Sequence, residues 1–336
     1  MQRIQSLQVL RFVAAISIAA RHLRDSPLNA LDPGGFGVDV FFVISGFIIC
    51  LVSDGRRPGE FIWDRAARVV PLYWLLTLAV TAVALLAPSL LNSTSAEPML
   101  VLQSLLFIPF MKASGAMQPI LFVGWTLNYE MFFYALFSLC LFAGRLAPML
   151  MLAVLAGLAA AGHLVAFTAP PLAFWTDGYI LEFGYGIVLC LVWRRRRFGP
   201  WLSVLGGLGL ALVLWPTWTA LPLPREIVYG VPAALAVAGT LAVQIERTGF
   251  WLPLIALGNA SYALYLSHPY VVLGIDAVTR RLGMDSGVVA IIADVIALVL
   301  ACMVALLIYH GFERPVQRWL LRHGPERRHP GVVTAT

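Results

Sequence analysis

The sequence predicts an all-α fold: a polytopic membrane helix bundle with about ten transmembrane helices and both termini in the cytoplasm. Hydrophobic residues make up 60% of the 336 residues, charged residues only 12%, and the mean hydropathy is +0.85. Apolar runs of about 20 residues, the length that crosses a bilayer, recur along the whole chain. No polar block divides the sequence. We therefore expect one membrane domain at 1–322 and a short basic cytoplasmic tail at 323–336.

The first predicted helix, 7–23, contains Arg11 and His22 in an otherwise apolar run. Their spacing corresponds to about three turns, so both side chains lie on one face, about 16 Å apart along the axis. An ionisable residue inside a spanning helix is costly and normally faces a polar cavity. The pair therefore indicates a polar path through the bundle. Because Arg11 interrupts the apolar run, a cleaved signal peptide is not expected.

Nine further helices follow from the remaining apolar runs. They are predicted at 37–53, 69–88, 124–143, 147–167, 179–193, 201–219, 228–244, 251–274 and 288–310. The run at 99–111 is too short to span, and Pro109, Gly115 and Pro119 indicate a bent, re-entrant or interfacial segment that could line an acceptor groove.

Basic residues set the orientation of these helices. With the N-terminus inside, 16 of the 23 Lys and Arg residues fall in inside segments and six in outside segments, while Arg11 lies within a helix. Counting 99–111 as an eleventh span would move the four arginines at 194–197 outside, which argues against it. The net charge of +6 therefore reports topology and gives no argument for nucleic-acid binding.

With this orientation the intramembrane polar residues fall into two layers. The outer layer consists of His22, Asp39, Glu130 and His268. The inner layer consists of Arg65 and Arg68, on the loop before the third helix, and Glu313 at the end of the tenth. Arg11 lies between the layers, nearer the inner one.

The outer layer contains a candidate acid–base site. A histidine can take a proton from a hydroxyl, and a carboxylate can fix its tautomer and stabilise the imidazolium. A single residue of this kind more often hydrogen-bonds a neighbouring helix. His22, Asp39 and Glu130 at one depth favour catalysis, with His22 as the base and either carboxylate orienting it.

Arg65 and Arg68 are spaced i, i+3, so on a helix they share a face. Two planar guanidinium groups suit a phosphate or pyrophosphate, although cytoplasmic loops are basic for topological reasons and spacing alone does not decide. Tyr73 and Trp74 follow closely and are typical of an interfacial aromatic belt; stacking on a nucleotide base is the alternative.

The four cysteines lie in apolar runs without a C-x-x-C pair and indicate buried thiols, so no metal site is expected.

Together these residues resemble the acyltransferase-3 family of integral membrane acyltransferases, which includes O-antigen, exopolysaccharide and Nod-factor O-acetylases. The resemblance covers Ile4 to about Arg322. It is carried, in order, by Arg11-x10-His22, GVDVFFVISGF at 37–47, R-x-x-R with P-x-Y-W at 65–74, W-T-L-x-x-E-x-x-F-Y at 125–134, SYALYLSHPY at 261–270 and Glu313-Arg314-Pro315. Thr126 stands where the family usually has Ser, and Ser267 where many members have an aromatic residue.

The resemblance implies an acyl-CoA-dependent O-acyltransferase that moves acetyl from cytoplasmic acetyl-CoA to a glycan hydroxyl, of exopolysaccharide or lipopolysaccharide O-antigen type. It implies that His22 is the essential catalytic residue and that Arg65 and Arg68 are required. We further expect Asp39 and Glu130 in the catalytic set, and Arg11, Tyr73 and Trp74 beside the two arginines at the acetyl-CoA site. Trp125 and His268 are candidate substrate-binding residues. The expected setting is a bacterial inner membrane, crossed many times, with a glycan or glycolipid acceptor as partner.

Two mechanisms and several other functions stay open. His22 could activate the acceptor hydroxyl for direct attack on the thioester, or could itself carry the acetyl group. A glycan flippase or acyl-group transporter is the main alternative, since carriers also use intramembrane ionisable residues, although no internal repeat is visible. Another acyl-CoA, or a small-molecule acceptor such as a macrolide sugar, is a further option; a scaffolding protein ranks last. Oligomeric state and any partner protein are open.

Overall fold

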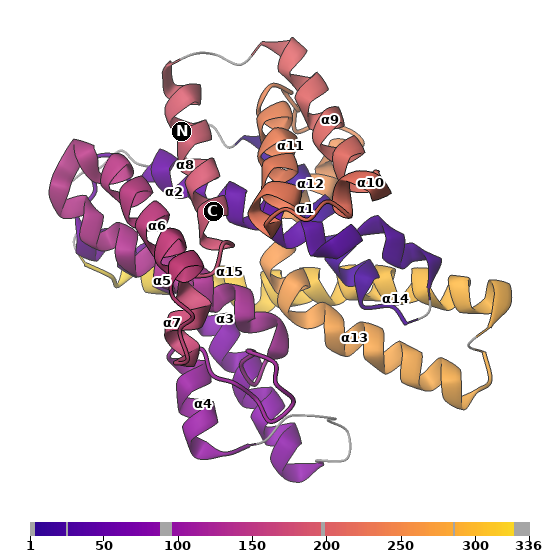
Figure 1. The fold of residues 1–336 in the computed structure, drawn as a ribbon. Helices are drawn as coiled ribbons and strands as arrows, with labels where there is room; N and C mark the ends of the chain where they lie inside the picture. Colours follow the sequence, from indigo (N-terminus) through magenta and orange to yellow (C-terminus); the bar gives the residue numbers. More distant parts are fainter. Residues whose placement is uncertain (1–3, 25, 88–95, 196–198, 285, 326–336) are drawn as a thin grey trace.

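The computed structural model describes residues 4–24, 26–87, 96–195, 199–284 and 286–325, and helices dominate this part of the chain (Figure 1). No β-strand is present among these residues, where an isolated bridge joins Met111 and Met117. This confirms the all-α class. Most of the predicted basic tail, 326–336, lies outside the described residues.

Five helical stretches are long and apolar enough to cross a membrane: Pro33–Val52, Pro58–Leu86, Phe122–Leu164, Pro170–Arg195 and Gly287–Arg322. The ten-span count and the cytoplasmic termini stay predictions.

Every predicted apolar segment contains a helix. The main helices are α1 (Gln5–Arg21), α2 (Phe36–Val52), α3 (Pro58–Leu86), α5 (Trp125–Cys140), α6 (Ala147–Leu164), α8 (Ile180–Arg195), α9 (Ser203–Leu214), α11 (Val231–Leu241), α13 (Ser261–Arg281) and α14 (Gly287–Ile308). Shorter helices are α4 (Pro98–Leu105), α7 (Pro170–Trp175), α10 (Pro216–Thr219), α12 (Trp251–Asn259) and α15 (Arg314–Arg322).

Helix α3 begins much earlier than predicted. We expected a helix at 69–88 with Arg65 and Arg68 on the loop before it, but both arginines lie within α3, which starts at Pro58. Proline at the first helical position and Glu60 in the first turn are favourable helix-start residues. The opening turns carry charged residues, so hydropathy alone missed them. Because both arginines are helical, the predicted shared face is confirmed.

Two other segments also differ from a continuous spanning helix. The predicted helix at 251–274 is divided into α12 and α13 at Ala260. The run at 99–111 contains α4, whose eight residues extend only about 12 Å, so it does not span. After α4 the chain turns at Phe107, which has a φ of 58°. These breaks depend on packing that apolar periodicity does not encode.

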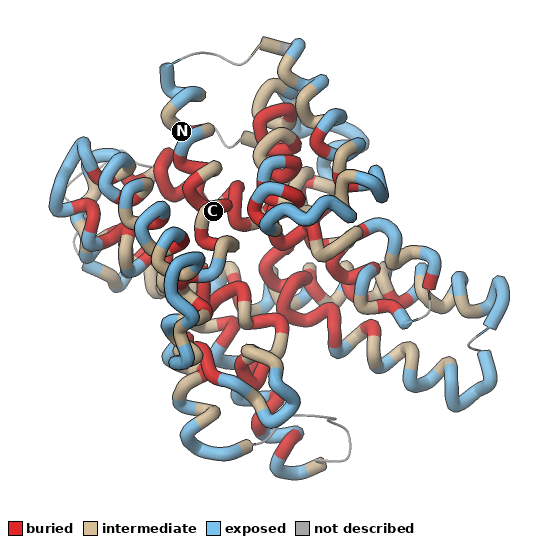
Figure 2. Tube along the Cα trace, in the orientation of Figure 1, coloured by how far each residue is buried: buried red, intermediate tan, exposed pale blue. Residues whose placement is uncertain are grey.

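The packed centre of the bundle lies around α1 and α2. Buried residues gather there, whereas the outward-projecting ends of α3, α13 and α14 are largely exposed (Figures 1 and 2). The contact between α2 and α8 is the most extensive of those between described helices. It is close because Gly46 faces the backbone of Phe183 and Gly186 faces the backbone of Val43, leaving no room for a Cβ. Small residues at helix interfaces are typical of membrane bundles.

Candidate functional site

His22 lies at the C-terminal cap of α1, directly beside His268 of α13. The ring centroids are 4.9 Å apart and the rings are inclined by 64°. His22 Nδ1 lies 2.9 Å from the Ile18 carbonyl oxygen and 3.2 Å from His268 Nε2. Phe122 packs against His22 with a centroid distance of 5.7 Å. His22 is partly exposed, whereas His268 is fully buried, so His22 is the member of the pair that can meet a substrate.

A cavity of about 70 Å³ lies between α1, α2, α3, α5 and α13. Arg11, Arg68 and Glu130 line it, together with Tyr265. The ring of Tyr265 lies 6.0 Å from that of His268. The cavity therefore extends from Arg11 and Arg68 to Tyr265, whose ring packs near His268.

Charges of both signs surround Arg11. Arg68, Glu313 and Glu130 all lie within electrostatic range of its guanidinium group. Arg65, one turn before Arg68, is near Tyr134 and Asp64. The buried Nε of Arg65 has no hydrogen-bond partner among the described residues. The predicted inner layer is thus assembled in space from α1, α3 and the segment Tyr309–Glu313.

Glu130 lies with the arginines and not with His22. Its carboxylate accepts hydrogen bonds from the Tyr134 hydroxyl and, at 3.0 Å, from Ser45 Oγ. Glu130 shares a cavity with Arg11, which is about 16 Å from His22 along α1. The expected arrangement, with Glu130 at the depth of His22, is therefore corrected: Glu130 contributes negative charge next to Arg11 and Arg68.

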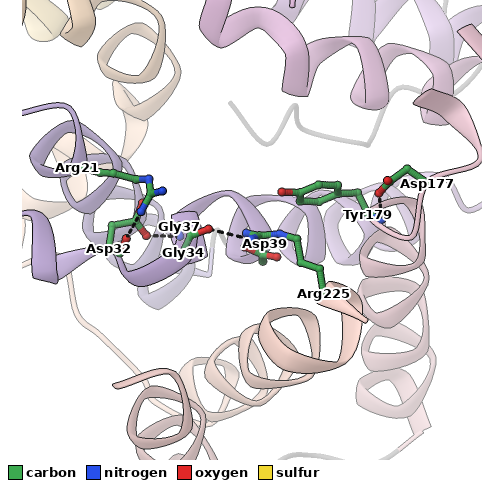
Figure 3. A network of polar contacts seen from close by, with 8 residues as sticks. All are labelled: Arg21, Asp32, Gly34, Gly37, Asp39, Asp177, Tyr179 and Arg225. Atoms are coloured by element: carbon green, nitrogen blue, oxygen red, sulfur yellow. Dashed lines mark hydrogen bonds and ion pairs between the residues drawn. The ribbon is translucent and has the colours of Figure 1, made fainter. Parts of the chain in front are cut away.

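Asp39 has a different partner from the one we expected. Its Oδ2 accepts a 2.7 Å charge-assisted hydrogen bond from Arg225 Nη2, and Arg225 Nη1 donates to the Gly34 carbonyl at 2.8 Å (Figure 3). The guanidinium group of Arg225 also lies over the rings of Tyr179, at 4.8 Å, and Tyr229, at 4.5 Å. Of the described contacts of His22, none involves Asp39. Asp39 thus anchors the segment that follows α1 instead of orienting the imidazole.

Glu182 and Arg225 were missed in the sequence. Glu182 of α8 is fully buried and faces the carboxyl group of Asp39. Neither carboxylate oxygen of Glu182 has a hydrogen-bond partner among the described residues. Burial lowers the pKa of Arg225, but Asp39, Tyr179 and Glu182 more than offset this, so the pKa lies above its ordinary value and Arg225 stays charged. A carboxylate within an apolar run could have identified Glu182; Arg225 carries no comparable signal.

The connector between α1 and α2 is fixed at several points (Figure 3). Arg21 donates to the Asp32 carbonyl at 3.1 Å, and Asp32 Oδ1 accepts from the Gly37 amide at 2.8 Å. Burial raises the pKa of Asp32 to about 6, against the opposing effects of the Gly37 amide and Arg21. Gly34 has a φ of 66° and lies against Tyr229, with no room for a side chain. These contacts hold the chain that leaves His22.

Tyr73, Trp74 and Trp125 have protein partners. Tyr73 is buried, donates to the Ser104 carbonyl at 3.0 Å and stacks on Phe107. Trp74 Nε1 donates to the Leu105 carbonyl at 2.8 Å. Both therefore hold α4 and its exit turn against α3. Trp125 packs against Tyr179 at 5.4 Å, close to the Arg225 cluster. The predicted ligand-binding roles of these aromatic residues stay predictions.

A second cavity, of about 370 Å³, lies where the C-terminal end of α1 meets α13 and α14. Leu23, directly after His22, and Val272, one turn after His268, form part of its wall. Arg280 Nε donates to Asp276 at 2.9 Å, and Arg24 lies 3.7 Å from the same carboxylate. The charged and hydroxyl-bearing part of the lining consists of Arg24, Ser26, Asp276, Thr279, Arg280, Ser286 and Asp294.

Comparison with known proteins gives a consistent result. Residues 4–310 match the acyltransferase domain model of the acyltransferase-3 family. The chain is 39% identical to the exopolysaccharide production protein ExoZ of Rhizobium meliloti, covering 88% of this chain and 92% of that protein. It is 28% identical to the acyltransferase MdmB of Streptomyces mycarofaciens, covering 99% and 96%. It is 27% identical to the putative peptidoglycan O-acetyltransferase YrhL of Bacillus subtilis, covering 94% and 55%. No solved structure matches the chain.

Proposed function

Because the chain belongs to the acyltransferase-3 family, we propose that it is a membrane O-acyltransferase that moves acetyl from cytoplasmic acetyl-CoA to a hydroxyl group of a glycan. The relative named as an exopolysaccharide production protein supports an exopolysaccharide acceptor, and the putative O-acetyltransferase supports acetyl as the transferred group. The observation that carries the proposal is the placement of Arg11 and His22 on one helix, with a cavity beginning at Arg11.

The donor site is proposed at the arginine cluster. Arg68 and Arg11 line the cavity, and the buried Nε of Arg65 lacks a hydrogen-bond partner among the described residues. A buried donor without a partner is costly, and a phosphate oxygen could satisfy it. The residues thus fit the phosphates of coenzyme A, whose extended pantetheine arm would follow the α1 face towards His22. Glu313 and Glu130 balance the positive charge when no donor is bound.

The chemistry is proposed as direct transfer. His22 takes the proton of the acceptor hydroxyl, and the hydroxyl oxygen forms a bond to the thioester carbonyl carbon. The carbon–sulfur bond breaks, and the coenzyme A thiolate receives the proton from His22. Transfer through an acetyl-His22 intermediate is the competing mechanism. It predicts a labelled enzyme when acceptor is withheld.

The acceptor is proposed to bind in the second cavity. Its paired charges and hydroxyl groups suit a molecule that both donates and accepts hydrogen bonds, as a sugar does. Leu23 and Val272 place this cavity next to the histidine pair. Asp294→Asn should therefore raise the KM for acceptor and leave donor binding unchanged. A change confined to donor affinity would contradict this placement.

The decisive experiment uses purified full-length protein in nanodiscs with acetyl-CoA labelled in its acetyl group. Label should move to added host polysaccharide with release of free coenzyme A, and His22→Ala should abolish both. His163→Ala is the matched control, because His163 pairs with Glu226 at 3.2 Å, away from His22. Failure of the wild-type protein to bind or consume any acyl-CoA would overturn the proposal and favour a transporter.

A further inference from the structure

The hydrogen-bond partner of His268 determines which nitrogen of its ring carries the proton. His268 Nδ1 lies 3.1 Å from the carbonyl oxygen of Leu264, one turn earlier on α13. A carbonyl oxygen can only accept, so Nδ1 must be the protonated nitrogen. The Nε2 atom of neutral His268 therefore carries a lone pair, and this atom faces His22.

The same reasoning assigns the proton of His22. Its Nδ1 lies 2.9 Å from the Ile18 carbonyl oxygen and 3.2 Å from His268 Nε2. Both neighbours are acceptors, so His22 Nδ1 carries a proton that is shared between them. Neutral His22 then keeps its lone pair on Nε2. This is the nitrogen that a general base would use on an acceptor hydroxyl.

We propose that His268 is a positioning residue that holds His22 in the Nδ1–H tautomer and stabilises the imidazolium formed when His22 Nε2 takes the acceptor proton. The inference rests on the proposed transferase function. His268 keeps the same number of protons throughout: the acceptor proton moves to His22 Nε2 and then to the coenzyme A thiolate. The hydrogen bond from His22 Nδ1–H to His268 Nε2 becomes charge-assisted when His22 is protonated, and such bonds are stronger than neutral ones.

A neutral imidazole fits this place better than the carboxylates first considered. Asp39 is engaged by Arg225, and Glu130 by Tyr134 and Ser45. His268 is fully buried, with a relative exposure of 0%, and burying a neutral ring costs far less than burying a charge. Its burial also replaces our expectation of substrate contact: in this structure His268 touches His22, which in turn can meet the substrate.

The test compares amide side chains that imitate one or the other ring nitrogen. His268→Gln places an amide oxygen near the Nε2 position and keeps an acceptor for His22. His268→Asn reaches only the Nδ1 position, and His268→Leu offers no acceptor. Each variant is expressed in a source strain from which the gene for this protein has been deleted. Membranes of that strain are then supplied with acetyl-CoA that carries a labelled acetyl group. Label in the polysaccharide fraction is measured.

We expect His268→Gln to transfer acetyl within about tenfold of the wild-type rate and His268→Asn and His268→Leu to lose about 10- to 100-fold. The loss is limited because the Ile18 carbonyl keeps part of the His22 population in the Nδ1–H tautomer. The loss should fall on kcat, with acetyl-CoA affinity unchanged, and His163→Gln should behave as wild type. Equal activity of the Gln and Asn variants, or a loss confined to KM, would overturn the inference. If the wild-type protein transferred no labelled acetyl group, the proposed function would fail instead.

A second measurement does not depend on activity. In protein labelled with ¹⁵N-histidine, the His22 signals are assigned by their absence in His22→Ala. We expect the Nδ1–H tautomer in the wild-type protein and in His268→Gln, and a mixture of tautomers in His268→Leu. An Nε2–H tautomer of His22 in the wild-type protein would overturn the inference even if transfer were observed.

Discussion

Arg225 and Asp39 lie 186 positions apart in the chain and form a 2.7 Å ion pair that joins the start of the Glu226–Gly230 helical turn to α2. The Asp39 side chain is fully buried, whereas that of Arg225 is 28% exposed. The pair closes the network that continues through Gly34 to the connector after His22 (Figure 3). Removing the Arg225–Asp39 ion pair tests whether the connector between α1 and α2 depends on it.

Arg225→Met should lower the free energy of unfolding by about 3 kcal/mol, because it leaves the buried Asp39 carboxylate without its cation. The thermal midpoint in detergent is the measurement. Asp39→Asn combined with Arg225→Met should recover part of the loss, since no buried charge then lacks a partner. Strictly additive effects of the two substitutions would show that the pair is not coupled.

Arg68→Ala should weaken acetyl-CoA binding about 10- to 100-fold, the value of a charge-assisted hydrogen bond, and leave the thermal midpoint nearly unchanged. Isothermal titration calorimetry measures the affinity. Arg57→Ala is the matched control, because Arg57 is an exposed arginine just before α3. Unchanged affinity in Arg68→Ala would remove the arginine cluster from the donor site.

Glu130→Gln should bind acetyl-CoA several-fold more tightly, because it removes a negative charge next to Arg11 and Arg68. The Gln oxygen can still accept from Tyr134 and Ser45, so the fold should persist. Equilibrium binding is compared with that of Glu97→Gln, an exposed control. If transfer were lost while binding stayed the same, Glu130 would instead have the catalytic role predicted from the sequence.

Asp32 should make stability fall as pH rises from about 4 to 6. Burial raises its folded-state pKa from 3.8 to about 6, so the stability it contributes is full below pH 3.8 and is lost as pH passes through about 6. Asp32→Asn cannot ionise and should be more stable than the wild-type protein by a few degrees at pH 7.5, with a smaller difference at pH 5. Thermal midpoints across this range measure the effect; parallel pH curves for the two proteins would contradict it.

Gly46→Ala should destabilise the bundle by about 1–3 kcal/mol or more, because its Cβ would meet the backbone of Phe183 across the α2–α8 contact. Gly157→Ala on α6 is the control, since a Cβ there meets open space. Thermal midpoints of both variants are measured in the same detergent. Equal stability of the two would indicate that α2 and α8 can separate without cost.

The sequence predicted the helices well because a bilayer demands long apolar runs, and each run contains a helix. It also predicted that Arg11 and Arg68 belong to one site, since intramembrane cations need a polar environment. It did not identify the partner of Asp39, because Arg225 is 186 positions away in the chain, at the start of the Glu226–Gly230 turn. It did not identify the neighbours of Glu130, because depth along a helix does not specify which neighbour the side chain faces. His268 was recognised as important, but its burial and its ring partner depend on how α1 and α13 pack.

The cavity that begins at Arg11 has room for only a few water molecules and not for a pantetheine arm. Tyr262 and Tyr265 help to keep it narrow, because their hydroxyl groups are bound to the carbonyls of Val69 and Val123. Under the proposed function, an acyl donor that follows this route has to push these helices apart. A protein that hands a chemical group across a bilayer would discharge the electrochemical gradient if its route stood open and hydrated. If the proposed function holds, the narrow cavity of the ligand-free protein limits such a leak, and a bound acyl donor would fill the space that opens between the helices.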